Sequence, residues 1–436
     1  MAWDGYFTYA GQEFINAVRT QAYAEHAGAG WLKSCYDGGD LGVMLGESYR
    51  SPMLDPAPWT DPDAPESYGF YGVYPLGTTG IEDSTRVGVV VESTGDGGTV
   101  GRVRNGTRAV VFNVALVGDS DCALDYGMRW LRRLLLGAAC GTQANEACAG
   151  SDLCYLSCEP QLDWDHGGTV LDALDCLDPY ERSLRRVVFN TGPTLTSKQN
   201  MTDGGAVWTA TMTAVAGNPW EFGTETPIVE SFSDTNHNPY VCEPAGLINL
   251  NGPIVDDSSC RPSSYQPVFN PACPSFIEPP SPPTVAIGCY VPPGNWKRRQ
   301  FTIPESFIPL WGEVVPKIEI HAPTTGKVTN VRLRFYADVD GDNNIDDDVC
   351  AYCGDIVVSY VPQGETLVLD GSDQLVYVES PGGEGRRRAD SLVFATDGTP
   401  FEWPVLSCGF TYIVTVDTEQ TAVLPKVDLS LYARAS

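Results

Sequence analysis

Short runs in which apolar and polar residues alternate recur along the chain, most clearly in segments 107–117 and 206–216. Because successive side chains of a strand point to opposite faces of its sheet, this alternation predicts strands with one buried face. The apolar positions that share a face are Val110, Phe112, Val114 and Leu116 in the first segment and Trp208, Ala210, Met212 and Ala214 in the second. The hexamer RRVVFN at 185–190 is similar to RAVVFN at 108–113. Six residues are too few to indicate a duplicated domain, so we expect two strands of one sheet.

A hairpin is expected upstream of these strands. Segments 86–92 and 100–103 are rich in valine, and the glycines between Gly95 and Gly98 separate them. Valine favours strands and glycine favours tight turns. A strand rather than a helix follows the glycines, so this segment does not predict a phosphate-binding loop.

The C-terminal third of the chain shows the same patterning at short, regular intervals. Such spacing is typical of a β-sandwich. The predicted strands are 314–321, 330–336, 356–361, 366–369, 374–379, 392–395, 411–416 and 426–432.

One segment has helical periodicity instead. Apolar residues recur at steps of three and four, which predicts an amphipathic helix; they are Ala123, Tyr126, Trp130, Leu131, Leu134 and Leu135. Asp119 or Ser120 can cap its start and Gly137 can end it. Three arginines near its C-terminal end suit the helix dipole, and we expect the helix to pack on a core.

Two irregular stretches interrupt the strands and set the expected domain organisation. Residues from about 137 to 180 are predicted to form a loop-rich insertion that carries cysteines among glycine, alanine and aspartate. Prolines crowd the stretch that follows residue 226 and exclude regular helix or central strand there. We therefore expect a mainly β protein with minor α content, with a first domain at 1–225, a strap or linker at 226–297 and a β-sandwich at 298–436.

Composition narrows the class of function. The chain has 436 residues and a formal net charge of -29. Such an acidic chain is unsuited to binding DNA or RNA sequence-specifically or to attaching to anionic lipid, because both need concentrated positive charge. No stretch of 18 apolar residues could span a membrane, and the N-terminus lacks a secretory signal. We therefore expect synthesis in a cytosol, where the 14 cysteines are unusual.

An acidic segment at 338–348, DVDGDNNIDDD, is the sharpest candidate site. Oxygen-bearing residues at alternate positions can turn inward around a hard cation, and here they are Asp338, Asp340, Asp342, Asn344 and Asp346. The spacing resembles the calcium loops of dockerin and EF-hand proteins, but Val349 stands where a bidentate acid is expected. A calcium site and a solvated acidic hairpin both fit this segment.

No catalytic residue is predicted, because the sequence contains no GxSxG, HExxH, Walker A or GxGxxG motif in its required context. Cys350 and Cys353 form a single CxxC, which is a weak zinc signal. Buried free thiols, or disulfides formed after release from a cell, fit the cysteines better. We expect no cofactor other than calcium.

The aromatic residues Phe401 and Trp403 admit two interpretations. Aromatic rings can stack on the apolar faces of sugars, so this pair could line a shallow sugar-binding face. Aromatic residues of a β-sandwich more often lie in its core, and we favour that interpretation.

The order of these parts resembles a known family. The phrases that carry the resemblance are WDGYFTYAGQEFINAVRTQAY near the N-terminus, RAVVFNVALVGDSDCALDYGMRWLRRLL, VWTATMTAVAGNPWEFG, WGEVVPKIEI and VRLRFYADVDGDNNIDDD. Together they resemble minor tail proteins of phages that infect mycobacteria and related actinobacteria. The layout is similar to that of the distal tail (Dit) proteins of long-tailed phages, over nearly the whole chain.

This resemblance implies a structural role in a virion. Distal tail proteins join the tail tube to the baseplate or tail tip. Their N-terminal β-barrel or sandwich domain with a helix closes a ring, usually of six copies, and a galectin-like β-sandwich follows. The resemblance then implies that residues 1 to about 225 form the ring, with the arginine-rich helix end and residues 108–117 near the subunit contacts. It also implies assembly in the host cytoplasm beside tail tube and tail-tip proteins.

We therefore expect a non-enzymatic distal tail or minor tail subunit located at the phage tail tip. The alternative is a tail protein that binds host cell-wall carbohydrate through its C-terminal sandwich.

Overall fold

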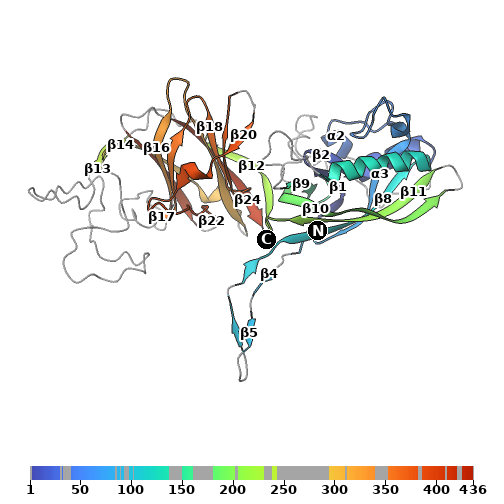
Figure 1. Cartoon of the computed structure of the whole chain (residues 1–436), viewed down its shortest axis with the longest axis horizontal. Coiled ribbons are helices and arrows are strands. Elements are labelled where there is room, and N and C mark those ends of the chain that lie inside the picture. The colour runs from blue at the N-terminus through green and yellow to red at the C-terminus, as the bar shows by residue number, and fades with distance from the viewer. Residues whose placement is uncertain are drawn as a thin grey trace, which may run out of the picture. The chain divides into compact units, whose positions relative to one another are not determined.

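The computed structural model describes residues 2–29, 32, 41–83, 86–88, 90–92, 98–101, 103–136, 150–160, 180–201, 205–229, 238–242, 294–309, 312–338, 352–381, 385–407, 410–419 and 425–435. Strands dominate and helices are few, which confirms the mainly β class (Figure 1). The chain forms two compact units, Met1–Thr224 with Ala435–Ser436 and Glu225–Arg434. The division falls next to the predicted boundary at residue 225.

The first unit is built on one antiparallel sheet with strand order β2-β1-β9-β10-β11-β8-β3. These strands are β1 (Trp3–Tyr9), β2 (Gln12–Asn16), β3 (Phe70–Thr79), β8 (Arg108–Gly118), β9 (Ser151–Leu156), β10 (Glu181–Asn200) and β11 (Ala206–Ala216). The two similar hexamers lie in β8 and β10, and both strands pair with β11. The prediction of two strands in one sheet is therefore confirmed.

Strand β9 corrects the prediction of a loop-rich insertion at 137–180. It lies between β1 and β10, with Leu153 opposite Tyr9 on one side and Leu184 on the other. Leu153 and Tyr155 are buried. Sequence reasoning missed this strand because its alternation spans six residues within a stretch rich in glycine, alanine and aspartate. Apart from 150–160 and Tyr180, the insertion lies outside the described residues.

Aromatic side chains fill the centre of the first unit. The Phe112 ring lies 5.1 Å from that of Phe7, 5.8 Å from that of Phe14 and 5.9 Å from that of Phe189, measured between centroids. These rings come from β8, β1, β2 and β10, so the sheet must curl to bring them together. The end strands β2 and β3 also contact each other, which is consistent with the predicted barrel-like arrangement.

Helix α3 (Asp121–Leu135) confirms the predicted amphipathic helix. The Ser120 side chain accepts a hydrogen bond from the Ala123 amide, as expected of an N-cap. The helix packs against β3, β8, β10 and β11. A Cβ added at Gly127 would lie 2.4 Å from the ring of Phe70, so glycine permits the close approach to β3.

The remaining helices of the first unit were not predicted. They are α1 (Ala17–His26), α2 (Leu41–Met44) and the 3-10 helix η1 (Pro65–Gly69). Helix α1 has a weak apolar stripe because it buries Arg19, which donates to Glu13 at 2.8 Å. The Asn16 side chain caps α1 by accepting from the Arg19 amide at 2.9 Å. A buried ion pair and a polar cap replace the apolar periodicity by which a helix is recognised.

The second unit is a β-sandwich. One sheet has the order β24-β15-β18-β19-β20, with β22 paired to β15 and the end of β12 paired to β24. Its strands are β12 (Glu221–Val229), which begins in the first unit beside β10, β15 (Glu313–His321), β18 (Thr366–Asp370), β19 (Leu375–Glu379), β20 (Arg386–Arg388), β22 (Leu406–Ser407) and β24 (Lys426–Ala435).

The other sheet has the order β13-β14-β23-β16-β17-β21. Its strands are β13 (Asn238–Cys242), β14 (Gly294–Ile303), β16 (Val328–Asp338), β17 (Tyr352–Val361), β21 (Val393–Phe394) and β23 (Thr411–Glu419). The described part of the second unit also contains the 3-10 helices η5 (Glu305–Phe307) and η6 (Asp390–Leu392). Ile318 and Leu369 of one sheet and Leu333, Ile356 and Val414 of the other belong to one core. All eight strands predicted between 314 and 432 are present.

The predicted strap at 226–297 contains the end of β12, strand β13 and the start of β14. The rest of the segment lies outside the described residues.

Candidate functional site

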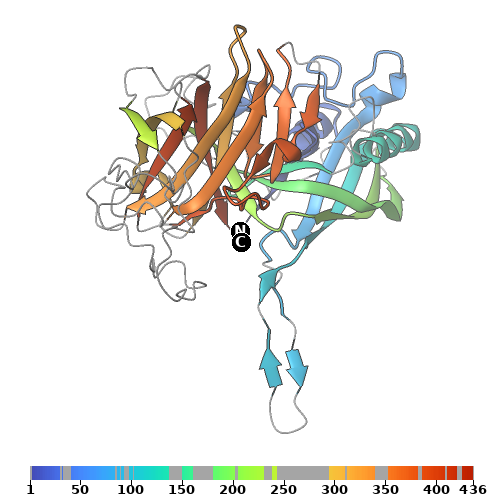
Figure 2. The ribbon, with the colours of Figure 1, turned by 60° about the vertical axis from the view of Figure 1, so that its left-hand side comes forward.

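A hairpin arm, defined here as residues 86–105, leaves the sheet of the first unit between β3 and β8. Its strands β4 (Arg86–Val87) and β7 (Arg104–Asn105) pair with each other, as do β5 (Val90–Glu92) and β6 (Gly98–Val100). Figures 1 and 2 show the arm extending away from that sheet. This pairing confirms the predicted hairpin.

In the hairpin arm, no described third strand pairs with either two-stranded ribbon. Its strands form two-stranded sheets only, and an isolated two-stranded ribbon is marginally stable in water. Val87 is 43% exposed and Val103 is 51% exposed. A projecting ribbon with exposed valines is well suited to packing against another protein surface.

A second feature of the first unit is an edge of β10 that no described strand covers, called here the free edge of β10. Up to Val187 the strand pairs on both edges, whereas beyond it the only described partner is β11. Val188 is 47% exposed. Pro193 lacks a backbone N–H, whereas the residues from Thr194 to Asn200 each have one. An edge of this kind can accept a strand from another chain.

Strand β8 does not have such an edge, which bears on the contacts implied by the resemblance. It pairs with β11 along its whole length and with β3 along most of it, and Arg108 is buried beside Glu221. Residues 111–117 are paired on both sides and can therefore contribute no open edge to a neighbour. The arginines of α3 differ, because Arg132 and Arg133 are exposed at the helix end.

A groove lies beside α3 in the first unit. Its volume is about 830 Å³, and Trp59, Tyr126, Trp130 and Arg133 are among the residues that line it. The Trp59 side chain is buried and donates to the Phe70 carbonyl at 2.8 Å, while the Tyr126 hydroxyl donates to the Trp59 carbonyl at 2.7 Å. These contacts hold the aromatic wall in place.

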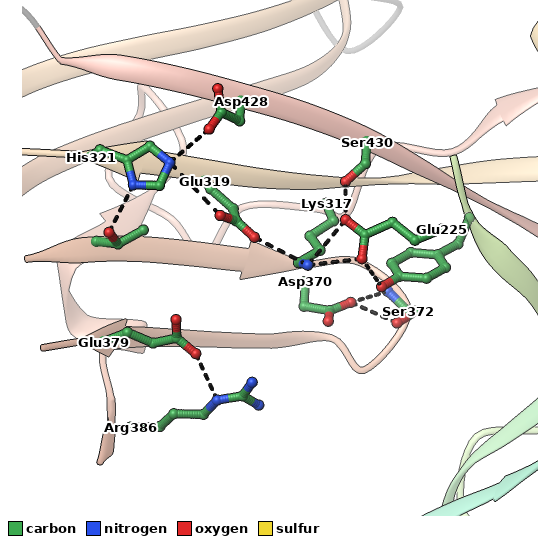
Figure 3. Close-up of polar contacts among 12 residues, drawn as sticks. Glu225, Lys317, Glu319, His321, Asp370, Ser372, Glu379, Arg386, Asp428 and Ser430 are labelled. Atoms are coloured by element: carbon green, nitrogen blue, oxygen red, sulfur yellow. Dashed lines mark hydrogen bonds and ion pairs between the residues drawn. The ribbon is translucent and has the colours of Figure 1, made fainter. Parts of the chain in front are cut away.

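In the second unit, polar side chains gather on the face of the β15 sheet that points away from the sandwich core (Figure 3). Glu225 accepts hydrogen bonds from Lys317, Ser430 and Tyr432. Burial opposes ionisation of Glu225, but these hydrogen bonds outweigh it and lower the pKa of its carboxyl below the usual value. Burial also opposes ionisation of Lys317, but its contacts with the carboxylates of Glu225 and Glu319 outweigh burial, and the net effect raises the pKa of Lys317.

The same face carries a compact group formed by Glu319, His321 and Asp428. Nε2 of His321 lies 2.9 Å from Oδ2 of Asp428 and 3.7 Å from Oε2 of Glu319. Within the described residues these three side chains form a possible metal-ligand set. Sequence reasoning missed the group because Glu319 and Asp428 are far apart in the chain and meet only through the register of β15 and β24.

Of the predicted calcium ligands, only Asp338 lies within the described residues. Asp338 is the last residue of β16 and is buried. Asp340, Asp342, Asn344 and Asp346 lie outside the described residues. The calcium site stays a prediction.

Four described cysteines are free thiols, namely Cys122, Cys154, Cys158 and Cys353. Burial raises the pKa of the Cys154 thiol to about 11, so it is protonated near neutral pH. The Cys353 thiol donates to the Phe335 carbonyl at 3.2 Å, and Cys350 lies outside the described residues.

Phe401 and Trp403 follow the interpretation favoured from the sequence. Both are half-buried and pack against the core of the second unit, and their ring centroids lie 4.8 Å apart. Their placement supports a structural role.

The chain was compared with protein families, curated proteins and solved structures. No protein-family model matches the chain, and no curated protein is similar to it. Among solved structures, the chain is similar to the Dit protein (gp 19.1) of SPP1, described as a paradigm of the hub adsorption apparatus in Gram-positive infecting phages. Identity is 9%, the TM-score is 0.36, and the match covers 85% of this chain and 96% of that chain. In the described part of the chain, no helix is long and apolar enough to cross a membrane.

Proposed function

We propose that the chain is a structural subunit of a phage tail tip, a distal tail or minor tail protein that joins the tail tube to the baseplate or tip complex. The family resemblance of the sequence motivates the proposal. The hairpin arm is the observation of the structure that supports it most, because it is a projecting ribbon without a supporting strand in the described chain.

A ring needs two different surfaces on each subunit, since its contacts are heterologous. The hairpin arm and the free edge of β10 supply two such surfaces in the first unit. In this proposal the arm of one subunit packs along the β10 edge of the next. Six copies per ring is the number that the resemblance implies.

The mass of the purified chain in solution, with negative-stain images of the same sample, tests this proposal. We expect closed rings with a central channel, and the mass gives the number of copies. A monomer at every concentration, also in the presence of the tail tube protein, would overturn ring formation.

Carbohydrate binding by the β-sandwich of the second unit is the alternative function. The half-buried position of Trp403 weakens the sugar platform that motivated it. A screen of cell-wall glycans with the full chain distinguishes the two functions: specific glycan binding by a monomer favours the alternative, and rings without glycan binding favour the structural role.

A further inference from the structure

Three side chains with metal-binding atoms converge on the outer face of the β15 sheet. Glu319 and His321 lie on β15 and Asp428 on β24, with Glu319 directly opposite Asp428. Ile318, Ile320 and Val427 alternate with them and belong to the core. Because side chains alternate across a strand, the three polar side chains lie on the face opposite the core. Figure 3 shows them close together.

The separations between the possible ligand atoms fit a small cation. In a tetrahedral site with metal–ligand bonds of about 2.0–2.2 Å, ligand atoms lie about 3.4 Å apart. The two distances from Nε2 of His321, 2.9 Å to Asp428 and 3.7 Å to Glu319, bracket that value. Small side-chain adjustments of Glu319, His321 and Asp428 would therefore bring the three ligand atoms to the separations that an ion requires.

The imidazole is already oriented for this role. Nδ1 of His321 lies 2.8 Å from Oγ1 of Thr366, which is its cross-strand neighbour on β18. A hydrogen bond at one ring nitrogen fixes the ring and directs the other nitrogen to a metal, as the outer-shell partners of metal-bound histidines do. Here the nitrogen so directed is Nε2, which faces both carboxylates.

The charges around the group leave room for a cation. Two carboxylates directly opposite each other on neighbouring strands repel. Lys317 contacts Oε1 of Glu319 at 3.1 Å and so leaves Oε2 directed at the histidine. Lys426 contacts Oδ2 of Asp428 at 3.0 Å, but its side chain is half exposed and can turn into solvent when an ion binds.

We propose that Glu319, His321 and Asp428 bind one divalent first-row transition-metal ion, with water completing the coordination. One imidazole with two carboxylates suits ions such as Mn²⁺ and Zn²⁺. The ion joins β24 to β15, and binding to the folded state alone raises the stability of the second unit.

The test uses Mn²⁺, because Zn²⁺ would also bind the thiols of the 14 cysteines. An Asp340→Ala background removes a predicted ligand of the acidic segment at 338–348, which is a second possible site for the ion. Free Mn²⁺ is measured by electron paramagnetic resonance during titration of the full chain. One bound equivalent is expected, and it raises the unfolding midpoint.

The variants His321→Gln and Asp428→Asn are expected to weaken Mn²⁺ binding at least about ten-fold. The matched control is Glu379→Gln, a half-exposed carboxylate on the same sheet that pairs with Arg386, and it is expected to bind as the background does. Circular dichroism and metal-free unfolding verify that each variant is folded. No binding at millimolar Mn²⁺, or equal binding by folded His321→Gln and Asp428→Asn variants, would overturn the proposal.

Discussion

The two units differ in which parts of their sheets are held by contacts within the unit. In the first unit the β10 edge beyond Val187 has no described partner, and the hairpin arm is a ribbon without a third strand. In the second unit two sheets face each other over one core, and the outer face of the β15 sheet is crossed by hydrogen bonds and ion pairs within the unit. Assembly contacts are therefore best sought in the first unit, whereas side-chain contacts within the second unit hold its β15 sheet together.

Their interiors differ as well. The first unit is centred on phenylalanine rings and also buries the Arg19–Glu13 ion pair, whereas the second has a largely aliphatic core and a buried carboxylate shared by two arginines. Asp355 accepts from Nε of Arg332 at 3.1 Å and from Nε of Arg334 at 3.0 Å, and all three side chains are buried. The first unit should therefore be most sensitive to lost volume and the second to lost charge.

The largest effect is expected for Phe112→Ala, which removes the ring shared by β1, β2, β8 and β10. Its cavity should lower the free energy of unfolding of the first unit by about 3–5 kcal/mol. Hydrogen exchange followed by mass spectrometry checks this, with faster exchange expected in 108–118 and unchanged exchange in 352–361. Phe112→Leu is the matched control and should cost less. Equal protection in the wild type and Phe112→Ala would contradict the aromatic core.

Breaking the buried ion pairs of Asp355 is expected to destabilise the second unit instead of the first. Asp355→Asn keeps the shape but leaves Arg332 and Arg334 without their shared carboxylate, which should cost about 3 kcal/mol. Exchange should now rise in 352–361 and not in 108–118. The control Asp390→Asn removes the partner of exposed Arg388, where a loss of about 0–1 kcal/mol is expected. If both variants lowered the free energy of unfolding by similar amounts, burial would not determine how much these ion pairs stabilise the fold.

Removing the cap of α3 is expected to have a smaller effect. Ser120→Ala deprives the Ala123 amide of its acceptor and should cost about 1 kcal/mol. Denaturant unfolding measures the loss, and Ser120→Asp should restore most of it because aspartate also caps helices. No difference between alanine and aspartate at this position would argue against the cap.

The smallest effect concerns pH. The hydrogen bonds of Glu225 lower the pKa of its carboxyl below the ordinary value of 4.5. Such a group stabilises the folded state above its unfolded pKa, and this stabilisation disappears as the pH falls through the folded pKa.

Glu225→Gln should therefore reduce stability by about 1 kcal/mol or less at neutral pH, since Glu225 is partly exposed. The difference from wild type should shrink at acidic pH. Unfolding midpoints measured from neutral pH downward check this prediction, with Glu379→Gln as a carboxylate without these hydrogen bonds. A difference that grows as the pH falls would contradict the sign.

Much of this fold follows from local pattern. The eight C-terminal strands, the hairpin arm and α3 were predictable because one face of each is apolar or because turn residues bound them. Helix α1 and strand β9 were not predictable. The buried Arg19–Glu13 pair interrupts the apolar pattern of α1, and β9 has only six residues. The group of Glu319, His321 and Asp428 depends on long-range strand register, which no local pattern encodes.

We propose that the hairpin arm closes a ring of subunits. The most direct test compares the mass distribution of the wild type with that of a Val87→Asp, Val103→Asp variant, by mass photometry at matched concentrations. Val43→Asp is the control, because Val43 is an equally exposed valine of the same unit outside the arm. The account predicts rings for the wild type and the control and monomers for the arm variant. Rings of unchanged mass in the arm variant, or monomers throughout, would contradict it.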